Sequence, residues 1–321
     1  MTQYDADQTR MLLAAVLAET RKAVVGKDLI LTKVLAAFLA GGHVLMEDFP
    51  GVGKTTLALA FSKALGLSCR RVQFTPDVLP SDLTGFSVYQ KDTGKFVFQP
   101  GALFCNLLLA DEINRTSSKT QSALLESMEE GHITVEGRTY ALPHPHLVIA
   151  TQNPLGSAGT QSLPESQLDR FLMRLQMGYP LLQDEVDMLR RKAVQNPLDL
   201  VQPVLNSDKL SMLQRIAAEI YVDERLYFYA ASLAKATREH PQVLLGVSPR
   251  GTLALLSAAK AMALLRGRNY LLPDDITPLC TDVLSHRMRT KSGVSPEQIL
   301  SEILRSIPVP TPERRRGYVD A

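Results

Sequence analysis

A glycine-rich turn between a strand-like run and a helical stretch constrains the fold of this chain more than any other feature. Residues 43–46 predict a buried strand, and residues 55–65 predict a helix that stops at Gly66. Between them, residues 47–56 read Glu-Asp-Phe-Pro-Gly-Val-Gly-Lys-Thr-Thr. This arrangement is typical of a phosphate-binding loop. Successive backbone N–H groups and the positive end of the helix dipole together bind an anion there.

The side chains of this loop suit a nucleoside triphosphate with Mg²⁺. We predict that Lys54 reaches the β- and γ-phosphates and that the Thr55 hydroxyl ligates the metal. Asp48 departs from the general motif, which has glycine at that position. Aspartate tolerates unusual backbone angles, and we expect its side chain to point away from the phosphates. The predicted binding residues of the loop are Pro50, Gly51, Val52, Gly53, Lys54, Thr55 and Thr56.

Two later apolar runs end in polar side chains that suit the same site. Residues 107–110 lead into Asp111 and Glu112, a Walker B pattern in which Asp111 holds the Mg²⁺ shell and Glu112 orients the attacking water. Residues 147–151 lead to Asn153, whose amide suits a contact with the γ-phosphate or water. Taken alone, each run could end in an ordinary solvated turn. Their order and separation from Lys54 favour the nucleotide site.

Strands alternate with helices from residue 43 to about 179, which predicts an α/β fold with a parallel sheet covered on both faces. Two helices, over residues 9–23 and 28–40, precede the sheet. From Ser207 onward the chain looks all helical. We predict a P-loop core over residues 1–200 and an all-α lid domain over residues 201–321. Two β-hairpin insertions, at residues 86–98 and 132–141, either extend the core or engage a partner.

These motifs, in this order, resemble the AAA+ ATPases, and specifically the MoxR family, over nearly the whole chain. The family commonly carries Glu-Asp before the loop, so Asp48 fits it. Arg115 and Arg174 could also face a neighbouring subunit. The resemblance rests on Val25-Gly26-Lys27-Asp28 and on residues 47–55, 110–115, 150–154 and 167–171.

The resemblance also implies roles for residues outside the phosphate loop. Val25 and Gly26 would lie near the adenine, and Asn153 would be sensor 1. Arg170 would be the arginine finger that projects into a neighbouring subunit's site, and Arg250 would be sensor 2, which reaches the γ-phosphate from the lid. The fixed charge and forked donors of arginine match a phosphate. A surface salt bridge is the alternative for both arginines.

An ATPase that binds ATP and Mg²⁺ is the activity that the resemblance implies. Such a protein works as a homo-oligomeric ring, expected to be a hexamer, and remodels or activates protein clients as a chaperone. MoxR relatives commonly act with proteins that carry von Willebrand factor A domains, sometimes to insert metals. Two other functions stay open: a nucleic-acid motor similar to the minichromosome-maintenance helicases, and a nucleotide-gated binding module with negligible turnover.

Composition limits which kinds of partner and which cellular compartment we expect for this protein. Lys and Arg number 35 and Asp and Glu number 33, and this formal net charge of +2 argues against a dedicated nucleic-acid binder. The cysteines are far apart and the first residues carry no signal-peptide pattern, so we expect a cytoplasmic protein. The longest apolar stretch, around residues 34–39, is too short to span a bilayer.

Overall fold

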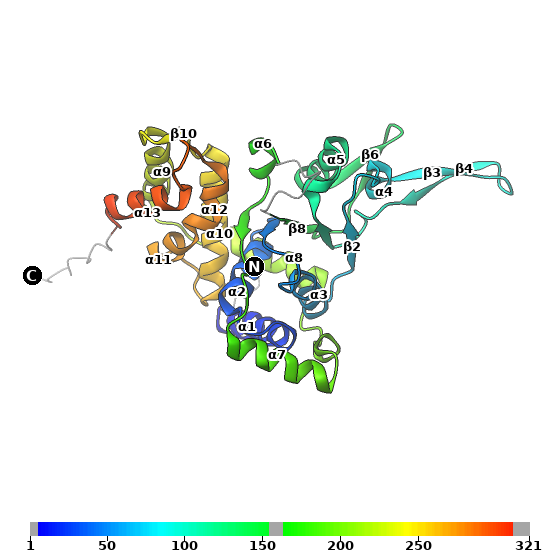
Figure 1. Cartoon of the computed structure of the whole chain (residues 1–321), viewed down its shortest axis with the longest axis horizontal. Helices are drawn as coiled ribbons and strands as arrows, with labels where there is room; N and C mark the ends of the chain where they lie inside the picture. Colours follow the sequence, from blue (N-terminus) through cyan, green and yellow to red (C-terminus); the bar gives the residue numbers. More distant parts are fainter. Residues whose placement is uncertain (1–5, 154–162, 311–321) are drawn as a thin grey trace, which may run out of the picture.

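A five-stranded parallel sheet forms the centre of the first part of the chain (Figure 1). The structure is a computed structural model that describes residues 6–153 and 163–310. The spatial order of the strands is β2-β5-β8-β1-β9, and every neighbouring pair is parallel. The predicted α/β fold is thereby confirmed. The strands are β1 (Val44–Glu47), β2 (Cys69–Gln73), β5 (Leu107–Asp111), β8 (Leu147–Gln152) and β9 (Met173–Leu175).

Helices cover both faces of this sheet because alternate strand residues point to opposite sides. On β5, Leu107 and Leu109 join one buried cluster, and Leu108 and Ala110 join the other. The first cluster contains α1 (Ala6–Ala23), α2 (Asp28–Leu39) and α3 (Lys54–Ala64), and the second contains α5 (Ser118–Glu130).

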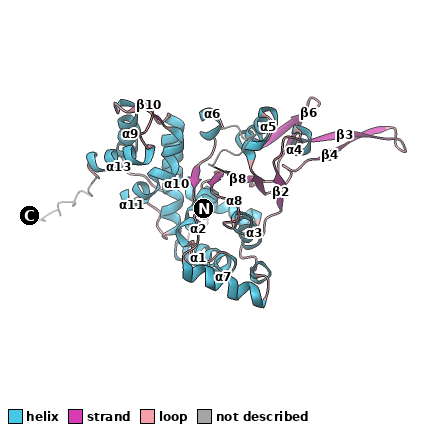
Figure 2. Cartoon of the chain, viewed as in Figure 1, coloured by secondary structure: helices cyan, strands magenta, loops and turns pink. Residues whose placement is uncertain are grey.

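Both predicted hairpins are present and antiparallel. They are β3 (Gly85–Gln90) with β4 (Lys95–Pro100), preceded by α4 (Pro80–Thr84), and β6 (His132–Val135) with β7 (Arg138–Ala141). The β3–β4 hairpin projects away from the body of the molecule (Figures 1 and 2). At its base, the Phe98 ring stacks on Tyr140 of the other hairpin, with ring centroids 4.0 Å apart. The two insertions therefore share one small packed joint.

The second part of the chain is mostly helical, as predicted. One difference is a short antiparallel pair of β10 (Val243–Leu245) and β11 (Arg289–Thr290), too short and irregular to give a strand pattern in the sequence. Ser248 caps α10 (Pro249–Leu265) by accepting a hydrogen bond from the Gly251 N–H. The remaining helices are α6 (Glu165–Leu168), α7 (Leu182–Val194), α8 (Ser207–Ala218), α9 (Glu224–Glu239), α10 (Pro249–Leu265), α11 (Pro273–Ile276), α12 (Cys280–Leu284) and α13 (Pro296–Ser306).

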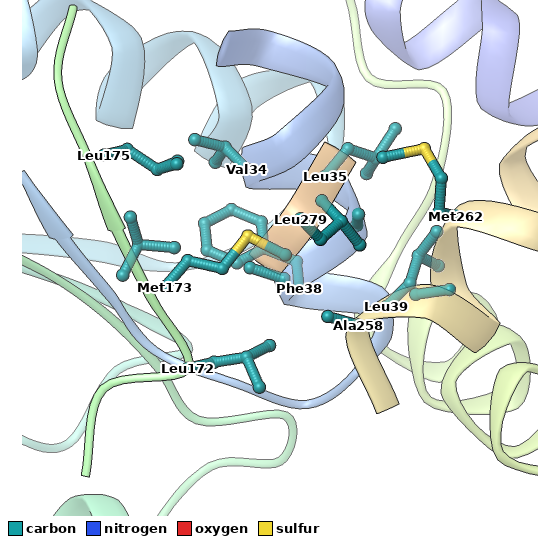
Figure 3. Close-up of a cluster of buried hydrophobic side chains, with 14 of the residues drawn as sticks. Val34, Leu35, Phe38, Leu39, Leu172, Met173, Leu175, Ala258, Met262 and Leu279 are labelled. Carbon is teal, nitrogen blue, oxygen red and sulfur yellow. The ribbon is translucent and has the colours of Figure 1, made fainter. Parts of the chain in front are cut away.

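The two parts of the chain share one hydrophobic core. Figure 3 shows side chains of α2, β9 and α10 in a single cluster, with Phe38 of α2 and Met262 of α10 among them. Phe38 is fully buried, and Met262 is almost so. This packing fixes where α10 begins relative to the sheet. Because both parts contribute to one core, the predicted division between residues 200 and 201 stays a prediction.

Within residues 6–153 and 163–310, no helix combines the length and the apolar character that crossing a bilayer requires.

Candidate active site

A polar cavity of about 330 Å³ lies at the carboxyl ends of the parallel strands, where ligands bind in open α/β sheets. It brings together the phosphate loop, the ends of β2 and β5, and the end of β8. Most of the predicted site residues line it. The lining residues are Asp48, Pro50, Gly51, Gly53, Lys54, Thr55, Thr56, Arg71, Gln73, Asp111, Glu112, Thr151, Gln152 and Asn153.

The loop has the backbone that an anion cradle requires. Gly51 and Gly53 have φ values of 85° and 100°, a region that favours glycine, and α3 begins directly after Gly53. Val52 is buried beside the cavity rather than lining it. The Lys54 ammonium donates to the carbonyls of Asp48 at 2.8 Å and Phe49 at 3.3 Å. Burial lowers the pKa of Lys54, and nearby carboxylates act in the opposite direction.

Asp48 points away from the phosphate cradle, as predicted. Its side chain is buried and accepts hydrogen bonds from the backbone N–H groups of Met177 and Gly178, the latter at 3.0 Å. Lys27 donates to the carbonyls of Met177 at 2.6 Å and Tyr179 at 2.9 Å. Segment 177–179 therefore links the phosphate loop to the turn before α2.

That turn carries the two residues expected near the adenine. Gly26 has φ +69°, and a Cβ atom there would come within 2.0 Å of an Asp184 carboxylate oxygen. The backbone angle therefore favours glycine here, and a larger residue would also require the Asp184 side chain to move. Val25 and Gly26 do not line the polar cavity, and Lys27 ties their turn to it through segment 177–179. Their contact with adenine stays a prediction.

The carboxylate of Asp111 is held from two sides. The Thr151 hydroxyl donates to its Oδ1 at 2.8 Å, and Arg71 pairs with its Oδ2 at 2.7 Å. Across the described residues, no group of three or more His, Cys, Asp or Glu side chains could hold a metal by itself. Mg²⁺ needs only one or two carboxylates beside phosphates and waters, so Thr55 and Asp111 fit it.

Glu112 adopts a left-handed backbone conformation, with φ 57° and ψ 50°. Such angles are costly outside glycine and gather at functional sites. Its N–H donates to the Thr151 hydroxyl at 2.9 Å. Its Oε2 accepts from Arg115 at 2.7 Å and from Gln73 at 3.0 Å. The carboxylate that would orient water is thus held by two side chains of its own chain.

Asn153 lines the cavity at the end of β8, in agreement with its predicted position. Arg71, Gln73, Thr151 and Gln152 line it as well, and no role was predicted for them from the sequence. Arg71 and Gln73 are two residues apart on β2 and therefore point to the same face. The strand that carries them has no apolar run, so no signal in the sequence pointed to either residue.

Arg170 and Arg250 lie elsewhere, and both contact Glu129. The Nη2 atoms of Arg170 and Arg250 are 3.3 Å and 3.0 Å from its carboxylate oxygens. Met128, the preceding residue, bonds through its carbonyl to His43, directly before β1. Glu129 therefore lies near the amino ends of the strands, whereas the phosphate loop lies at their carboxyl ends. The length of β1 alone, roughly 13 Å, separates these two ends of the sheet. The structure therefore does not bring Arg250 to the cavity of its own chain.

One buried joint holds the backbone segments that carry both arginines. The Arg287 side chain is only 2% exposed, and it pairs with Asp169 at 2.7 Å and donates to the Phe171 carbonyl at 2.6 Å. The Ser248 hydroxyl, which caps the helix of Arg250, donates to the same Asp169 carboxylate at 3.3 Å. Since α10 also packs on α2, the start of α10 is held at the end of α5.

Arg115 and Arg174 both pair with carboxylates of their own chain in this structure, and their facing a neighbouring subunit stays a prediction. Arg115 pairs with Glu112, as described. Arg174 bridges Glu47 at 3.3 Å and Glu297 at 2.8 Å, which joins β1 to α13.

Comparisons with known proteins agree with this geometry. The model of the ATPase family associated with various cellular activities (AAA) matches residues 43–173, and that of the AAA lid domain matches residues 235–303. The uncharacterized protein YeaC of Bacillus subtilis is 47% identical over 304 residues, which are 93% of this chain and 95% of YeaC. A crystal structure of a Cytophaga hutchinsonii protein has a TM-score of 0.88 and 35% identity, covering 96% of this chain and 97% of that one.

A second relative, which is named as a chaperone, is also similar over most of this chain. Chaperone MoxR1 of Mycobacterium tuberculosis is 38% identical over 306 residues, which are 91% of this chain and 81% of MoxR1. The similarity thus spans the sheet, the phosphate loop and the helical part together. From the family models, this relative and the assembled site, it follows that the chain belongs to the MoxR family of AAA+ ATPases.

Proposed function

We propose that this protein hydrolyses ATP to ADP and phosphate, with Mg²⁺, and uses the cycle as a chaperone that remodels or activates protein partners. The observation that carries the proposal is the single cavity that gathers Lys54, Thr55, Asp111, Glu112 and Asn153. These residues come from three separate strand ends, and their side chains supply the charge, metal ligands, base and amide that phosphoryl transfer needs.

Catalysis in this cavity is mainly positioning and electrostatic stabilisation, because phosphoryl transfer needs little covalent help from protein. Lys54 turns from the loop carbonyls toward the β- and γ-phosphates. Mg²⁺, held by Thr55 and Asp111, would neutralise charge that develops on the phosphate oxygens. Glu112 orients the attacking water, and Asn153 contacts the γ-phosphate or that water.

We propose that the subunits form a ring, expected to be a hexamer, in which each subunit supplies arginines to the ATP site of its neighbour. Arg170 and Arg250 lie near the amino ends of the strands, away from the phosphate loop of their own chain. In a head-to-tail ring they can therefore contact the nucleotide of a neighbouring subunit. Both side chains are partly exposed, and both pair with the single carboxylate of Glu129, which offsets one of their two positive charges. We therefore assign Arg170 as the arginine finger and Arg250 as a second phosphate contact, both acting on the next subunit.

Protein clients are proposed to meet the ring at the β3–β4 hairpin. Phe96 is 72% exposed and Tyr89 is 53% exposed on that projecting element (Figure 1). Their rings pack on each other, with centroids 5.3 Å apart. Exposed paired aromatic rings commonly serve protein recognition. A protein with a von Willebrand factor A domain is the proposed client, and metal insertion into such a complex is the proposed purpose.

The test separates nucleotide binding from chemistry. Glu112→Gln keeps the shape of the side chain and removes its charge, so ATP should still bind while turnover falls by roughly 100-fold or more. Lys54→Ala should abolish binding of a fluorescent ATP analogue. Immobilised Glu112→Gln protein with ATP should retain the client, and Lys54→Ala protein should not. Normal turnover in Glu112→Gln protein, or DNA-stimulated turnover without a protein client, would contradict the proposal.

A further inference from the structure

Arg71 is a cation inside the cavity that the proposed chemistry does not use. Its Nε donates to Asp111 Oδ2 at 2.9 Å, and its Nη2 lies 2.7 Å from the same oxygen. The other oxygen of Asp111 accepts from the Thr151 hydroxyl. Both oxygens of the predicted metal-holding carboxylate are therefore engaged by this chain's own side chains.

A divalent cation and a guanidinium compete for such an oxygen. At contact distance the two positive charges repel each other, and two nitrogens of the Arg71 guanidinium already contact Oδ2 of Asp111. We propose that Arg71 is a positioning residue that stands in for the divalent cation at Asp111 and must move off when metal and nucleotide bind. This inference rests on the proposed function, because it concerns the same ATP site.

The fold allows that movement at little cost. The side chain of Arg71 is 52% exposed, so it can turn into solvent without leaving a buried cavity. Its backbone stays fixed, because β2 pairs with β5 along its whole length, from Cys69 with Leu107 to Gln73 with Asp111. The exchange is therefore a side-chain rotation on a rigid strand.

The movement also reaches the water-orienting carboxylate. The Nη2 of Arg71 donates to Gln73 Oε1 at 3.3 Å, and Gln73 Nε2 donates to Glu112 Oε2 at 3.0 Å. When Arg71 leaves, Gln73 loses one of the two contacts that orient its amide. The state of Asp111 is thereby passed to Glu112 through the side chains of Arg71 and Gln73.

The experiment measures the Mg²⁺ dependence of nucleotide binding. A fluorescent ATP analogue is held at fixed concentration and free Mg²⁺ is titrated, for unchanged protein and for Arg71→Met. Removal of a half-exposed ion-pair partner should lower the half-saturating Mg²⁺ concentration by roughly twofold to fivefold. Arg71→Gln should do the same, and it replaces Arg71→Met if the methionine variant does not fold.

Arg70→Met is the matched control, because Arg70 is the preceding residue on β2 and points to the other face, donating to the Gly101 carbonyl at 2.7 Å. It should leave the Mg²⁺ dependence unchanged. An unchanged or raised half-saturating concentration in both Arg71 variants would overturn the inference. So would an equal loss of affinity at every Mg²⁺ concentration, because Arg71 would then be a phosphate contact. Failure of the unchanged protein to bind nucleotide at any Mg²⁺ concentration would instead refute the proposed function.

Discussion

A single buried carboxylate ties the phosphate loop to the segment that follows the last strand of the sheet. Asp48 is only 5% exposed and accepts hydrogen bonds from two consecutive backbone N–H groups, those of Met177 and Gly178. Glycine at this position could not make that connection. With aspartate in place of the motif's glycine, the loop backbone has less conformational freedom. In return, the loop is attached to the segment that leads to α7.

Asp48→Asn should weaken both the fold and the site. An asparagine presents one oxygen and one NH₂ group, so one of the two N–H donors is left without an acceptor and faces another donor. The free energy of unfolding should fall by about 1–3 kcal/mol, and ATP binding should weaken with it. Urea denaturation and analogue titration measure the two effects. Asp92→Asn, on the exposed turn of the β3–β4 hairpin, is the control and should change neither.

Buried histidine makes the fold sensitive to acid. Val148 N–H donates to Nδ1 of His43, so Nε2 carries the proton and bonds the Met128 carbonyl. Burial lowers the pKa of His43 to about 4. The unfolded chain then binds more protons than the folded one between about pH 6.5 and 4, and stability falls as the pH falls through that window.

His43→Gln should flatten this dependence, since a neutral amide does not titrate. Unfolding free energies at pH 7 and pH 5 should converge by about 1–2 kcal/mol relative to unchanged protein. His132→Gln on the β6 strand is the comparison, and because it leaves His43 in place it should retain the acid sensitivity that His43 confers. Parallel pH profiles for unchanged and His43→Gln protein would show that His43 does not contribute.

At the scale of elements, the strands that are buried on both faces could be predicted from the sequence, and the edge strand β2 could not. β5 and β8 are apolar runs that end in the site residues Asp111 and Asn153, and both were found. β2 is an edge strand with the sequence CRRVQ and mostly exposed side chains, so it carries no apolar pattern. Arg71 and Gln73 were missed for that reason.

The β3–β4 hairpin yields a prediction at this scale. Tyr89→Ser with Phe96→Ser removes two exposed rings, so the free energy of unfolding should change by no more than about 0.5 kcal/mol. ATP turnover without client should stay the same, while client retention by Glu112→Gln protein should be lost. Phe98→Ser, at the half-buried base of the hairpin, should instead lower stability. Undiminished client retention by the Tyr89/Phe96 variant would exclude the hairpin as the client contact.

At the scale of the whole molecule, the position of the helical part decides which site each arginine can serve. Arg250 was named in the sequence as the lid arginine, and it lies in the first turn of the helix that Ser248 caps. Its location was not predictable, because helix periodicity does not tell which surface a helix packs on. The contact of α10 with α2 is long-range and places Arg250 beside Arg170.

Mixing two inactive variants tests action between subunits. Lys54→Ala lacks a working loop and Arg170→Ala lacks the proposed finger, so each should hydrolyse little ATP alone. In mixed rings, a subunit with intact Lys54 can meet a neighbour with intact Arg170. Random pairing in an equal mixture should restore roughly a quarter of normal activity. A mixture of Arg170→Ala with the Lys54→Ala/Arg170→Ala double variant is the control, and recovery there would refute the assignment.

The joint around Arg287 has a consequence for how a ring reads its nucleotides. Because Asp169 is bound both to Arg287 and to the cap of α10, the backbone segments that carry Arg170 and Arg250 are tied to one carboxylate. Loss of that carboxylate would therefore disturb both arginines of a junction between subunits at once.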